Sequence, residues 1–183
     1  MIKLPKFEKT REYENNFYLS CENIRFSKFL AHYELFKMIE NLPGAIVECG
    51  VFKGISFVRF AGFRELFRNS YAHRLIGFDT FGKFPETKYE ADKELRNSFI
   101  RGAGEQSISK EQLYEVLKLK GVNRNIELVE GDICVTVPEY VKNHPELKIS
   151  LLNLSAGRPT QPIIKGNTTV KTSTALSRVF LLL

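Results

Sequence analysis

The sequence predicts an α/β fold built around a parallel sheet. Short apolar runs alternate with longer stretches in which apolar residues recur every three or four positions, and these are the patterns of buried strands and packed helices. The run 45–50 is apolar except for Glu48, as expected for a central strand covered on both faces. It ends in a turn that contains Gly50 and Gly54 and leads into a helix. Strands that alternate with helices favour parallel pairing through right-handed crossovers.

The first 44 residues are expected to form an N-terminal arm and one helix. Residues 1–16 are polar and charged, which predicts a loose arm. Aromatic and apolar side chains then recur at helical spacing over 17–39, with Asn23 or Ser27 as the expected cap. A stripe of this kind is typical of core packing. The functional alternatives are a lid over a ligand or a dimer contact.

A core is predicted over residues 45–154. After the first strand, the expected elements are a helix over 54–68, a strand over 74–79, a loop over 80–89 and a charged helix over 90–102. Ser109 and Gln112 have the spacing of a capping box, and they predict a helix that closes at Gly121.

The second half of the core continues the alternation. Residues 125–132 are typical of a third strand and turn, and residues 147–154 of a fourth strand. Between them we expect a short helix that opens near Thr136 and has Pro138 in its first turn.

The positive charge lies unevenly along the chain. The net charge is +6, but four of the 27 basic residues and none of the 21 acidic residues lie beyond position 154. Residues 1–154 therefore carry 23 basic and 21 acidic residues, a net charge of +2. A balanced core of this kind gives little support for nucleic-acid binding.

The sequence predicts a cytoplasmic protein that does not enter a membrane. No apolar run reaches the roughly 18–20 residues of a membrane span, and the N-terminus lacks the apolar stretch of a secretory signal. The three cysteines lie far apart, and none forms a Cys-x-x-Cys pair. This distribution indicates reduced, mostly buried thiols and neither a disulfide framework nor a zinc site.

The first strand and its turn predict a nucleotide-type pocket. Backbone can approach a ligand closely at Gly50 and Gly54, and the following helix points its N-terminus at that ligand. Asp79 ends the second strand at the distance expected of an acid that binds ribose hydroxyls. For Asp79 the alternative is a plain turn residue, and for Asp132 it is a side chain that bonds to nearby backbone N–H groups.

Four segments follow one another over residues 40–154, and together they carry a family resemblance. They are Val47–Ser56, Gly77–Phe81 with Pro85 after it, Glu130–Ile133 and Ile149–Leu154. In this order they resemble the macrocin O-methyltransferase family, a branch of the class I S-adenosylmethionine-dependent methyltransferases. The resemblance implies a Rossmann-like three-layer sandwich.

The resemblance also implies S-adenosylmethionine as the cofactor. Glu48 and Gly50 would line its methionine and ribose part, Asp79 would hold the ribose hydroxyls, and Asp132 with Ile133 would flank the adenine. The other motif positions expected near the cofactor are Cys49, Val51, Gly54, Ser56, Thr80, Phe81 and Gly131. The family methylates hydroxyls of sugars or related small natural products and uses a divalent metal, Mg²⁺.

The chain departs from the family after the fourth strand. There the family has an acidic Asp-x-Asp run that binds the metal beside the reacting hydroxyl, whereas here Leu154 is followed by Ser155-Ala156-Gly157. A metal that lowers the pKa of an acceptor hydroxyl needs carboxylate ligands. We therefore expect no metal site and name no catalytic residue. His32, His73 and His144 are scattered, and we expect them at the surface or at helix ends.

The segment 155–183 differs from the rest in composition, because it is rich in Thr and Ser and has no acid. We expect the fold to be truncated after the fourth strand, with this segment replacing a native C-terminal part through a frameshift or an alternative end. The alternative is a divergent, natural short member. Residues 179–183 are β-prone, and they are expected to cover the edge of the fourth strand.

Three functional interpretations follow. The first is an S-adenosylmethionine-dependent O-methyltransferase of small molecules, inactive in this form if its acids are indeed missing. The second is a non-catalytic protein that binds the cofactor or dimerises as a scaffold through its N-terminal helix. The third is an NAD-type oxidoreductase, which the missing Gly-x-Gly-x-x-Gly pattern disfavours.

Overall fold

The computed structural model describes residues 2–83, 90–154, 171–172 and 179–182. Within these ranges, none of the helices has the length and apolar character that crossing a membrane requires.

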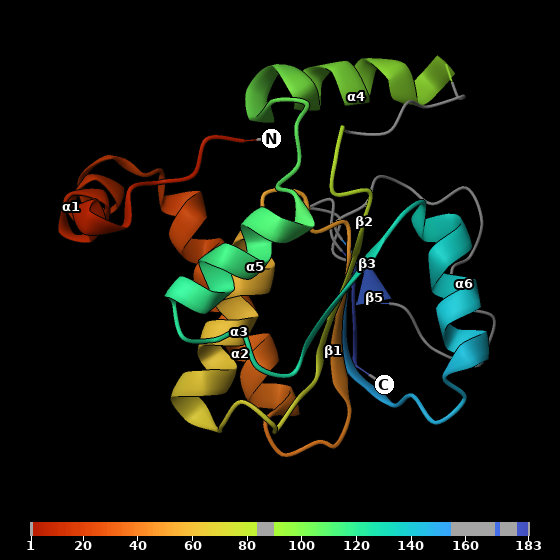
Figure 1. Ribbon diagram of the computed structural model, residues 1–183. Helices are drawn as coiled ribbons and strands as arrows, with labels where there is room; N and C mark the ends of the chain where they lie inside the picture. The colour runs from red at the N-terminus through yellow and green to blue at the C-terminus, as the bar shows by residue number, and fades with distance from the viewer. Residues whose placement is uncertain (1, 84–89, 155–170, 173–178, 183) are drawn as a thin grey trace.

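A six-stranded sheet with the order β3-β2-β1-β4-β6-β5 forms the centre of the molecule (Figure 1). Four strands are parallel, and they are β1 (Ala45–Cys49), β2 (Leu75–Asp79), β3 (Ile126–Glu130) and β4 (Ile149–Leu154). The predicted α/β fold with a parallel sheet is therefore confirmed, and all four predicted strands are present. Because β1 lies between β2 and β4, both of its edges are covered.

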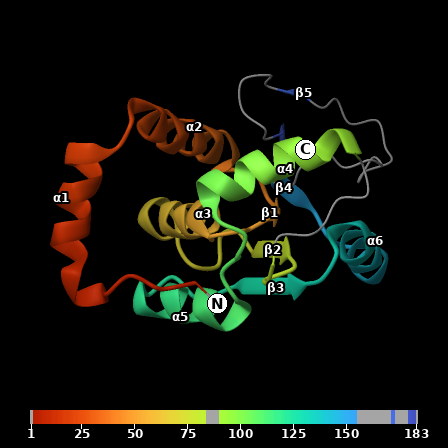
Figure 2. The ribbon, with the colours of Figure 1, turned by 90° about the horizontal axis from the view of Figure 1, so that it is seen from above.

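Helices cover both faces of the sheet and form the outer two of three layers. The first face carries α2 (Asn23–Ile39), α3 (Ile55–Phe67) and α5 (Lys110–Leu119), and the second carries α6 (Ile133–Asn143) (Figure 1). Helix α4 (Glu90–Ala103) lies across the carboxyl ends of the strands, as Figures 1 and 2 show from two directions. The carboxyl edge of the sheet therefore lies beneath a helix.

Alternating side chains of the strands build two separate hydrophobic clusters. Ile46 and Leu75 belong to the cluster under α2, α3 and α5, whereas Val47 and Ile76 belong to the cluster under α6. This alternation is the two-residue period of a strand, and it explains why the strands are apolar at nearly every position.

The N-terminal prediction was wrong in its boundaries. Instead of a loose arm and one helix, a short 3₁₀ helix η1 (Phe7–Lys9) leads into α1 (Thr10–Ser20), and α2 follows. Cys21 and Glu22 have extended backbone, with ψ of 145° at both, and this separates the two helices. Neither Asn23 nor Ser27 caps α2, because Asn23 is its first residue and Glu22 is the N-cap.

Helix α6 begins three residues earlier than predicted. Asp132 is its N-cap, and the Asp132 side chain accepts a hydrogen bond from the backbone N–H of Cys134. Pro138 therefore lies in the second turn of the helix, not in the first. The Asp132 side chain accepts from a backbone N–H group of the first turn that has no partner within the helix. This N-cap fixes the start of α6 more strongly than the preference of proline for the first turn does.

Two short strands follow β4 in the chain. Strand β6 (Val179–Leu182) pairs antiparallel with β4, and β5 (Lys171–Thr172) pairs antiparallel with β6. The prediction that the end of the chain covers the edge of β4 is confirmed for 179–182. Residues 155–170, which carry the expected break in composition, lie outside the described residues, as do 84–89 of the predicted loop.

Candidate functional site

Three loops meet at the carboxyl edge of the sheet, and Asp79 joins them. Its Oδ2 accepts a hydrogen bond from the backbone N–H of Phe52 at 2.8 Å, in the loop after β1. Its Oδ1 accepts from the N–H of Phe81 at 2.9 Å, in the loop after β2. Its backbone carbonyl accepts from the N–H of Gly131 at 2.9 Å, in the loop after β3. One residue therefore fixes the relative positions of all three loops.

Two of these contacts hold phenylalanines in an unfavourable backbone conformation. Phe52 has a φ of 52° and Phe81 a φ of 48°, in the left-handed region that bulky residues rarely adopt. Such conformations persist only where the surroundings impose them, and they are frequent at ligand sites. Here the carboxylate of Asp79 binds both backbone N–H groups, so it stabilises both strained residues at once.

The segment that precedes α5 closes over the same loops. The backbone N–H of Ser107 donates to the carbonyl of Gly82 at 2.8 Å, and that of Ile108 donates to the carbonyl of Phe52 at 2.9 Å. The capping box of Ser109 and Gln112, predicted from the sequence, is present and fixes the start of α5 immediately after this segment. The segment is therefore attached to the site at one end and to a well-capped helix at the other.

The carboxylate of Asp79 is also approached by two hydroxyl groups. Ser107 Oγ lies 3.3 Å and Thr80 Oγ1 lies 3.4 Å from its Oδ1. These distances are at the long end for O–H···O bonds, whereas the two backbone contacts have ordinary lengths. Asp79 is 7% exposed. Asp79 therefore has the turn-forming role that the sequence left open as an alternative. Only its two hydroxyl contacts are weak enough for a ligand to replace them.

A second acid lies deeper in the sheet. The side chain of Glu48 in β1 is 1% exposed, and it accepts a hydrogen bond from Ser56 Oγ in the first turn of α3. Gly54, with a φ of 77°, is the N-cap of that helix, and a Cβ there would lie 3.0 Å from Leu113 Cδ1. The glycine therefore permits both the backbone turn and the close approach of α5. As predicted, the turn from Gly50 to Gly54 leads from β1 directly into a helix, and Ser56 of that helix bonds back to Glu48 of β1.

Other predicted positions contribute differently. Gly50, with a φ of 84°, donates its N–H to the carbonyl of Phe78, and Val51 is buried in the cluster under α3. The side chain of Cys49 faces the opposite cluster under α6. Burial, with Glu48 adding to it, raises the pKa of the Cys49 thiol to about 12. Cys49 therefore borders the site through its backbone, while its thiol is a core group.

The loop after β3 is shaped by its own hydrogen bonds. Asp132 Oδ1 accepts from the N–H of Cys134 at 2.9 Å, which is the turn-forming role set against a ligand role in the sequence. Gly131 has a φ of 137°, and a Cβ at this position would lie 2.8 Å from Thr136 Cγ2. Ile133 is half-buried and packs against the cluster under α6. The four segments that carry the resemblance thus meet at one edge of the sheet, apart from residues outside the described ranges.

Several solved methyltransferase structures resemble the chain. CalS11, a calicheamicin methyltransferase, is 21% identical with a TM-score of 0.66, and the match covers 94% of this chain and 85% of that one. Its apo structure, described as a TDP-rhamnose 3′-O-methyltransferase, is 19% identical with a TM-score of 0.54 and coverages of 94% and 86%. The O-methyltransferase NovP is 13% identical with a TM-score of 0.56 and coverages of 85% and 78%. No protein-family model and no curated protein matches the sequence.

The chain has a class I methyltransferase fold. At these identities the likeness establishes the fold alone. The predicted Rossmann-like class I architecture is therefore confirmed, while membership of the macrocin O-methyltransferase family stays a prediction.

Within this methyltransferase fold, two histidines lie where the sequence did not place them. His32 and His73 are each 2% exposed, so the expectation of surface or helix-end positions was wrong for both. His32 stacks on Phe60 with ring centroids 5.0 Å apart, and Arg59 Nη1 lies 3.1 Å from its Nδ1. Its position within the aromatic stripe of α2 was a usable signal of burial. His144 is the C-cap of α6, which confirms the helix-end prediction there.

The cysteines also differ from expectation. Only Cys49 is buried, whereas Cys21 is half-buried and Cys134 is exposed. The expectation of mostly buried thiols was therefore wrong, because α1 is peripheral and Cys134 lies at the exposed start of α6. All three are free thiols, as predicted.

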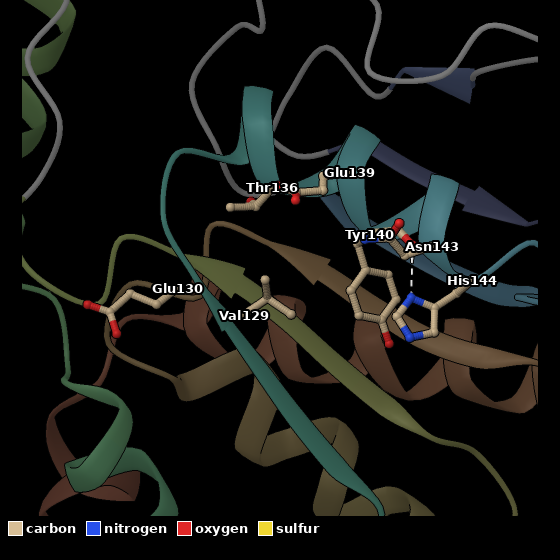
Figure 3. A pocket seen from close by; sticks show the side chains of 7 residues that line it. All are labelled: Val129, Glu130, Thr136, Glu139, Tyr140, Asn143 and His144. Atoms are coloured by element: carbon tan, nitrogen blue, oxygen red, sulfur yellow. Dashed lines mark hydrogen bonds between the residues drawn. The ribbon is translucent and has the colours of Figure 1, made fainter.

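A groove of about 270 Å³ runs between β3 and α6 (Figure 3). It is lined by Val129, Glu130, Thr136, Glu139, Tyr140, Asn143 and His144. The Tyr140 and His144 rings stack with centroids 4.0 Å apart, and the Tyr140 hydroxyl donates to Glu127 Oε2 at 2.8 Å. Burial and the contact with Glu127 raise the pKa of Tyr140 to about 12. The groove adjoins the Gly131–Asp132 turn, and no sequence motif marked it.

Among the described residues, no three His, Cys, Asp or Glu side chains are placed to hold a metal ion. The positions at which the resembled family has its metal-binding acids, 155–157, lie outside those residues.

Proposed function

We propose that this chain binds S-adenosylmethionine at the carboxyl edge of its sheet and is an O-methyltransferase of small molecules. The observation that carries the proposal is the meeting of three motif loops on one residue, Asp79, two through its carboxylate and one through its backbone carbonyl. In open α/β sheets this edge is where ligands bind. The cofactor supplies an electrophilic methyl group when it is bound.

The residues present fit this cofactor better than a phosphate-bearing one. Lys53 lies in the turn but lacks the spacing of a P-loop, and the glycine-rich run of a dinucleotide site is missing. A sulfonium nucleoside instead needs close backbone, a carboxylate for its ribose and acids near its positive charge. Gly50 and Gly54 offer the first, Asp79 the second and Glu48 the third.

Asp79 would retain its two backbone donors and exchange its two hydroxyl donors for the ribose diol. The contacts from Ser107 and Thr80, at 3.3 and 3.4 Å, are the weaker pair, so their replacement leaves the loops in place. Asp132 and Ile133, at the start of α6, would border the adenine.

A sugar or a related natural product is the acceptor that we propose. CalS11 is described as acting on TDP-rhamnose, which supports a sugar hydroxyl. The sequence after β4 has no acid to bind Mg²⁺ or to activate that hydroxyl. Cofactor binding does not need such an acid, whereas methyl transfer to a sugar hydroxyl would need another group to activate that hydroxyl.

Calorimetric titration tests the binding half directly. The full chain is titrated with S-adenosylmethionine, with NAD and with buffer alone, each with and without Mg²⁺. We expect saturable binding of S-adenosylmethionine only, and no change when Mg²⁺ is added. Binding of NAD in its place would favour an oxidoreductase, and binding of neither would sink the proposal.

The second candidate is a non-catalytic scaffold that forms a homodimer. Helix α1 has no buried residue, and Phe17, Tyr18 and Leu19 are 41%, 62% and 86% exposed. An isolated helix of 11 residues is only marginally stable in water, so packing against a second copy of the chain would stabilise α1. Sedimentation of the full chain distinguishes the two candidates. The scaffold is supported if the full chain is a dimer that binds no cofactor. The double variant Phe17→Ser, Tyr18→Ser should then be monomeric.

A further inference from the structure

Asn153 in β4 is a fully buried polar residue with an amide that the protein does not satisfy. Its side chain is 0% exposed, and within the described part of the chain neither Nδ2 nor Oδ1 has a hydrogen-bond partner. A side-chain amide carries two donors and an acceptor, and nearly all buried groups of this kind are paired in folded proteins. An unpaired one therefore indicates a missing partner, such as a ligand or a water.

The strand register places this amide beside Glu48. Asn153 pairs with Glu48 across β1 and β4, and parallel partners present their side chains to the same face about 4.8 Å apart. On its other side Glu48 pairs with Gly77, which has no side chain. The carboxylate of Glu48 is bound by Ser56 at the start of α3. Asn153 and Glu48 are therefore neighbouring polar residues on the face of the sheet that carries the start of α3.

This pair lies one residue inside the carboxyl edge of the sheet. Leu154 is the last residue of β4, and it pairs with Cys49, the last residue of β1. On the other flank of β4, the register partner of Asn153 is Phe180, a residue type with no polar side-chain atom. The protein's own neighbouring strands thus offer Asn153 only Glu48, and both residues lie one position inside the edge at which the cofactor is proposed to bind.

We propose that Asn153, together with Glu48, forms a subsite for the amino-acid head of the cofactor. This inference rests on the proposed function. An α-amino acid head carries an ammonium and a carboxylate on one carbon. Asn153 Oδ1 and the Glu48 carboxylate accept from the ammonium, while Asn153 Nδ2 donates to the carboxylate. An amide suits this zwitterion because it presents a donor and an acceptor side by side.

The test compares two nucleosides that differ only in the head. S-adenosylhomocysteine has the amino-acid head, whereas 5′-methylthioadenosine lacks it. We expect the wild-type chain to prefer S-adenosylhomocysteine, and Asn153→Leu to reduce that preference about tenfold or more, as the loss of hydrogen bonds to charged groups predicts. Binding of 5′-methylthioadenosine should change little. The ligand-free Asn153→Leu chain should melt no lower than the wild type, because the unpaired amide is gone.

Two further variants keep the test decisive. Asn153→Asp is nearly isosteric, so it preserves packing, but it replaces the donor Nδ2 with an oxygen and should also reduce the preference. Ser150→Ala is the matched control. Ser150 is a buried polar residue of the same strand, and its Oγ donates to the carbonyl of Ala45 at 3.1 Å, at the opposite end of β4. Ser150→Ala should leave the preference unchanged.

The outcomes separate the subsite from the proposed function. If the wild type binds both nucleosides and the Asn153 variants keep the full preference, the subsite is overturned alone, and a buried water accounts for the amide. Equal weakening of both nucleosides also overturns it. A wild-type chain that binds neither nucleoside overturns the proposed function and the subsite with it.

Discussion

At the scale of single residues, Asp79 has the largest structural role in the candidate site. Its carboxylate accepts two backbone hydrogen bonds from residues with positive φ, so it acts before any ligand arrives. A carboxylate at a strand end can be recognised in the sequence, but its partners cannot. The left-handed backbone of Phe52 and Phe81 has no sequence signature, because bulky residues are rare in that region.

Replacement of Asp79 should therefore affect both stability and binding. We expect Asp79→Asn to lower the free energy of unfolding by about 1–3 kcal/mol, since an amide nitrogen cannot accept the second N–H bond. Binding of S-adenosylmethionine should also be lost, as it should in Asp79→Ala. Urea unfolding and calorimetry measure the two effects. Asp132→Asn is the control, because Asn caps a helix as well as Asp does, so it should be neutral in stability. Equal stability of Asp79→Asn and the wild type would contradict the loop-fixing role.

The thiol of Cys49 gives a pH-dependent prediction. Burial raises its pKa from the ordinary 9.0 to about 12, so the folded state holds this proton more tightly than the unfolded state does. The resulting stability is fully present below pH 9 and is lost as the pH rises from about 9 to about 12. Unfolding free energies measured from pH 8 to 11 should fall less steeply for Cys49→Ala than for the wild type. Parallel slopes would show that the thiol does not contribute.

Arg64 offers a second test at this scale. It is fully buried, and its guanidinium donates to the carbonyls of His73 at 2.8 Å and Arg124 at 2.7 Å. We expect Arg64→Met to lower the free energy of unfolding by about 3 kcal/mol, because those carbonyls lose charge-assisted partners. The exposed Arg68→Met, one helical turn later, should change it by less than about 0.5 kcal/mol. A mild effect at Arg64 would mean that water can replace the guanidinium.

At the scale of elements, the helices show where sequence patterns succeed and fail. The Ser109–Gln112 box was predicted because both of its side chains are named in the sequence, and it is present. Most of helix α1 was missed because residues 10–16 are polar and charged apart from Tyr13, so they show no apolar repeat at helical spacing. The predicted start of α6 was wrong because an Asp after a strand is equally typical of a turn, a ligand site and a helix N-cap, and Asp132 is the N-cap.

The misplaced proline of α6 predicts a stabilising change. Pro138 lies inside the helix, where its ring nitrogen cannot donate to the carbonyl four residues earlier. We expect Pro138→Ala to raise the free energy of unfolding by about 1–3 kcal/mol, measured by urea denaturation. Glu139→Ala, at the next exposed position, serves as the control and should be nearly neutral. An unchanged value for Pro138→Ala would indicate that the helix bends to accommodate the ring.

At the scale of the whole molecule, the parallel core was predictable and the placement of polar groups within it was not. Alternating apolar runs and helical stretches predicted the four parallel strands. A strand that is buried on both faces must be apolar at nearly every position, and such a run is easy to recognise in the sequence. The pairing of Asn153 with Glu48 depends on register, and register depends on contacts between segments about 100 residues apart. The unpaired amide was therefore invisible until the strands were aligned.

The sheet order predicts a gradient of local stability. Strand β1 is covered on both edges, whereas β3 is an edge strand. Amide hydrogen exchange should therefore be slowest in β1 and faster in β3. In Leu181→Pro, loss of the β6 ladder should accelerate exchange in β4 and leave β3 unaffected, because Leu181 pairs with Leu152. Protection of β4 that survives this change would argue against the β6 pairing.

The joining of three loops to Asp79 also limits how this protein can be redesigned. Loops on such sheets are usually treated as separable modules, exchanged one at a time to change specificity. Here a graft that alters the loop after β1 shifts a backbone N–H group that donates to the carboxylate of Asp79. The same carboxylate holds the loop after β2, and the backbone carbonyl of Asp79 holds the loop after β3. The three loops are therefore structurally coupled, and a change of specificity would require all three to be exchanged together.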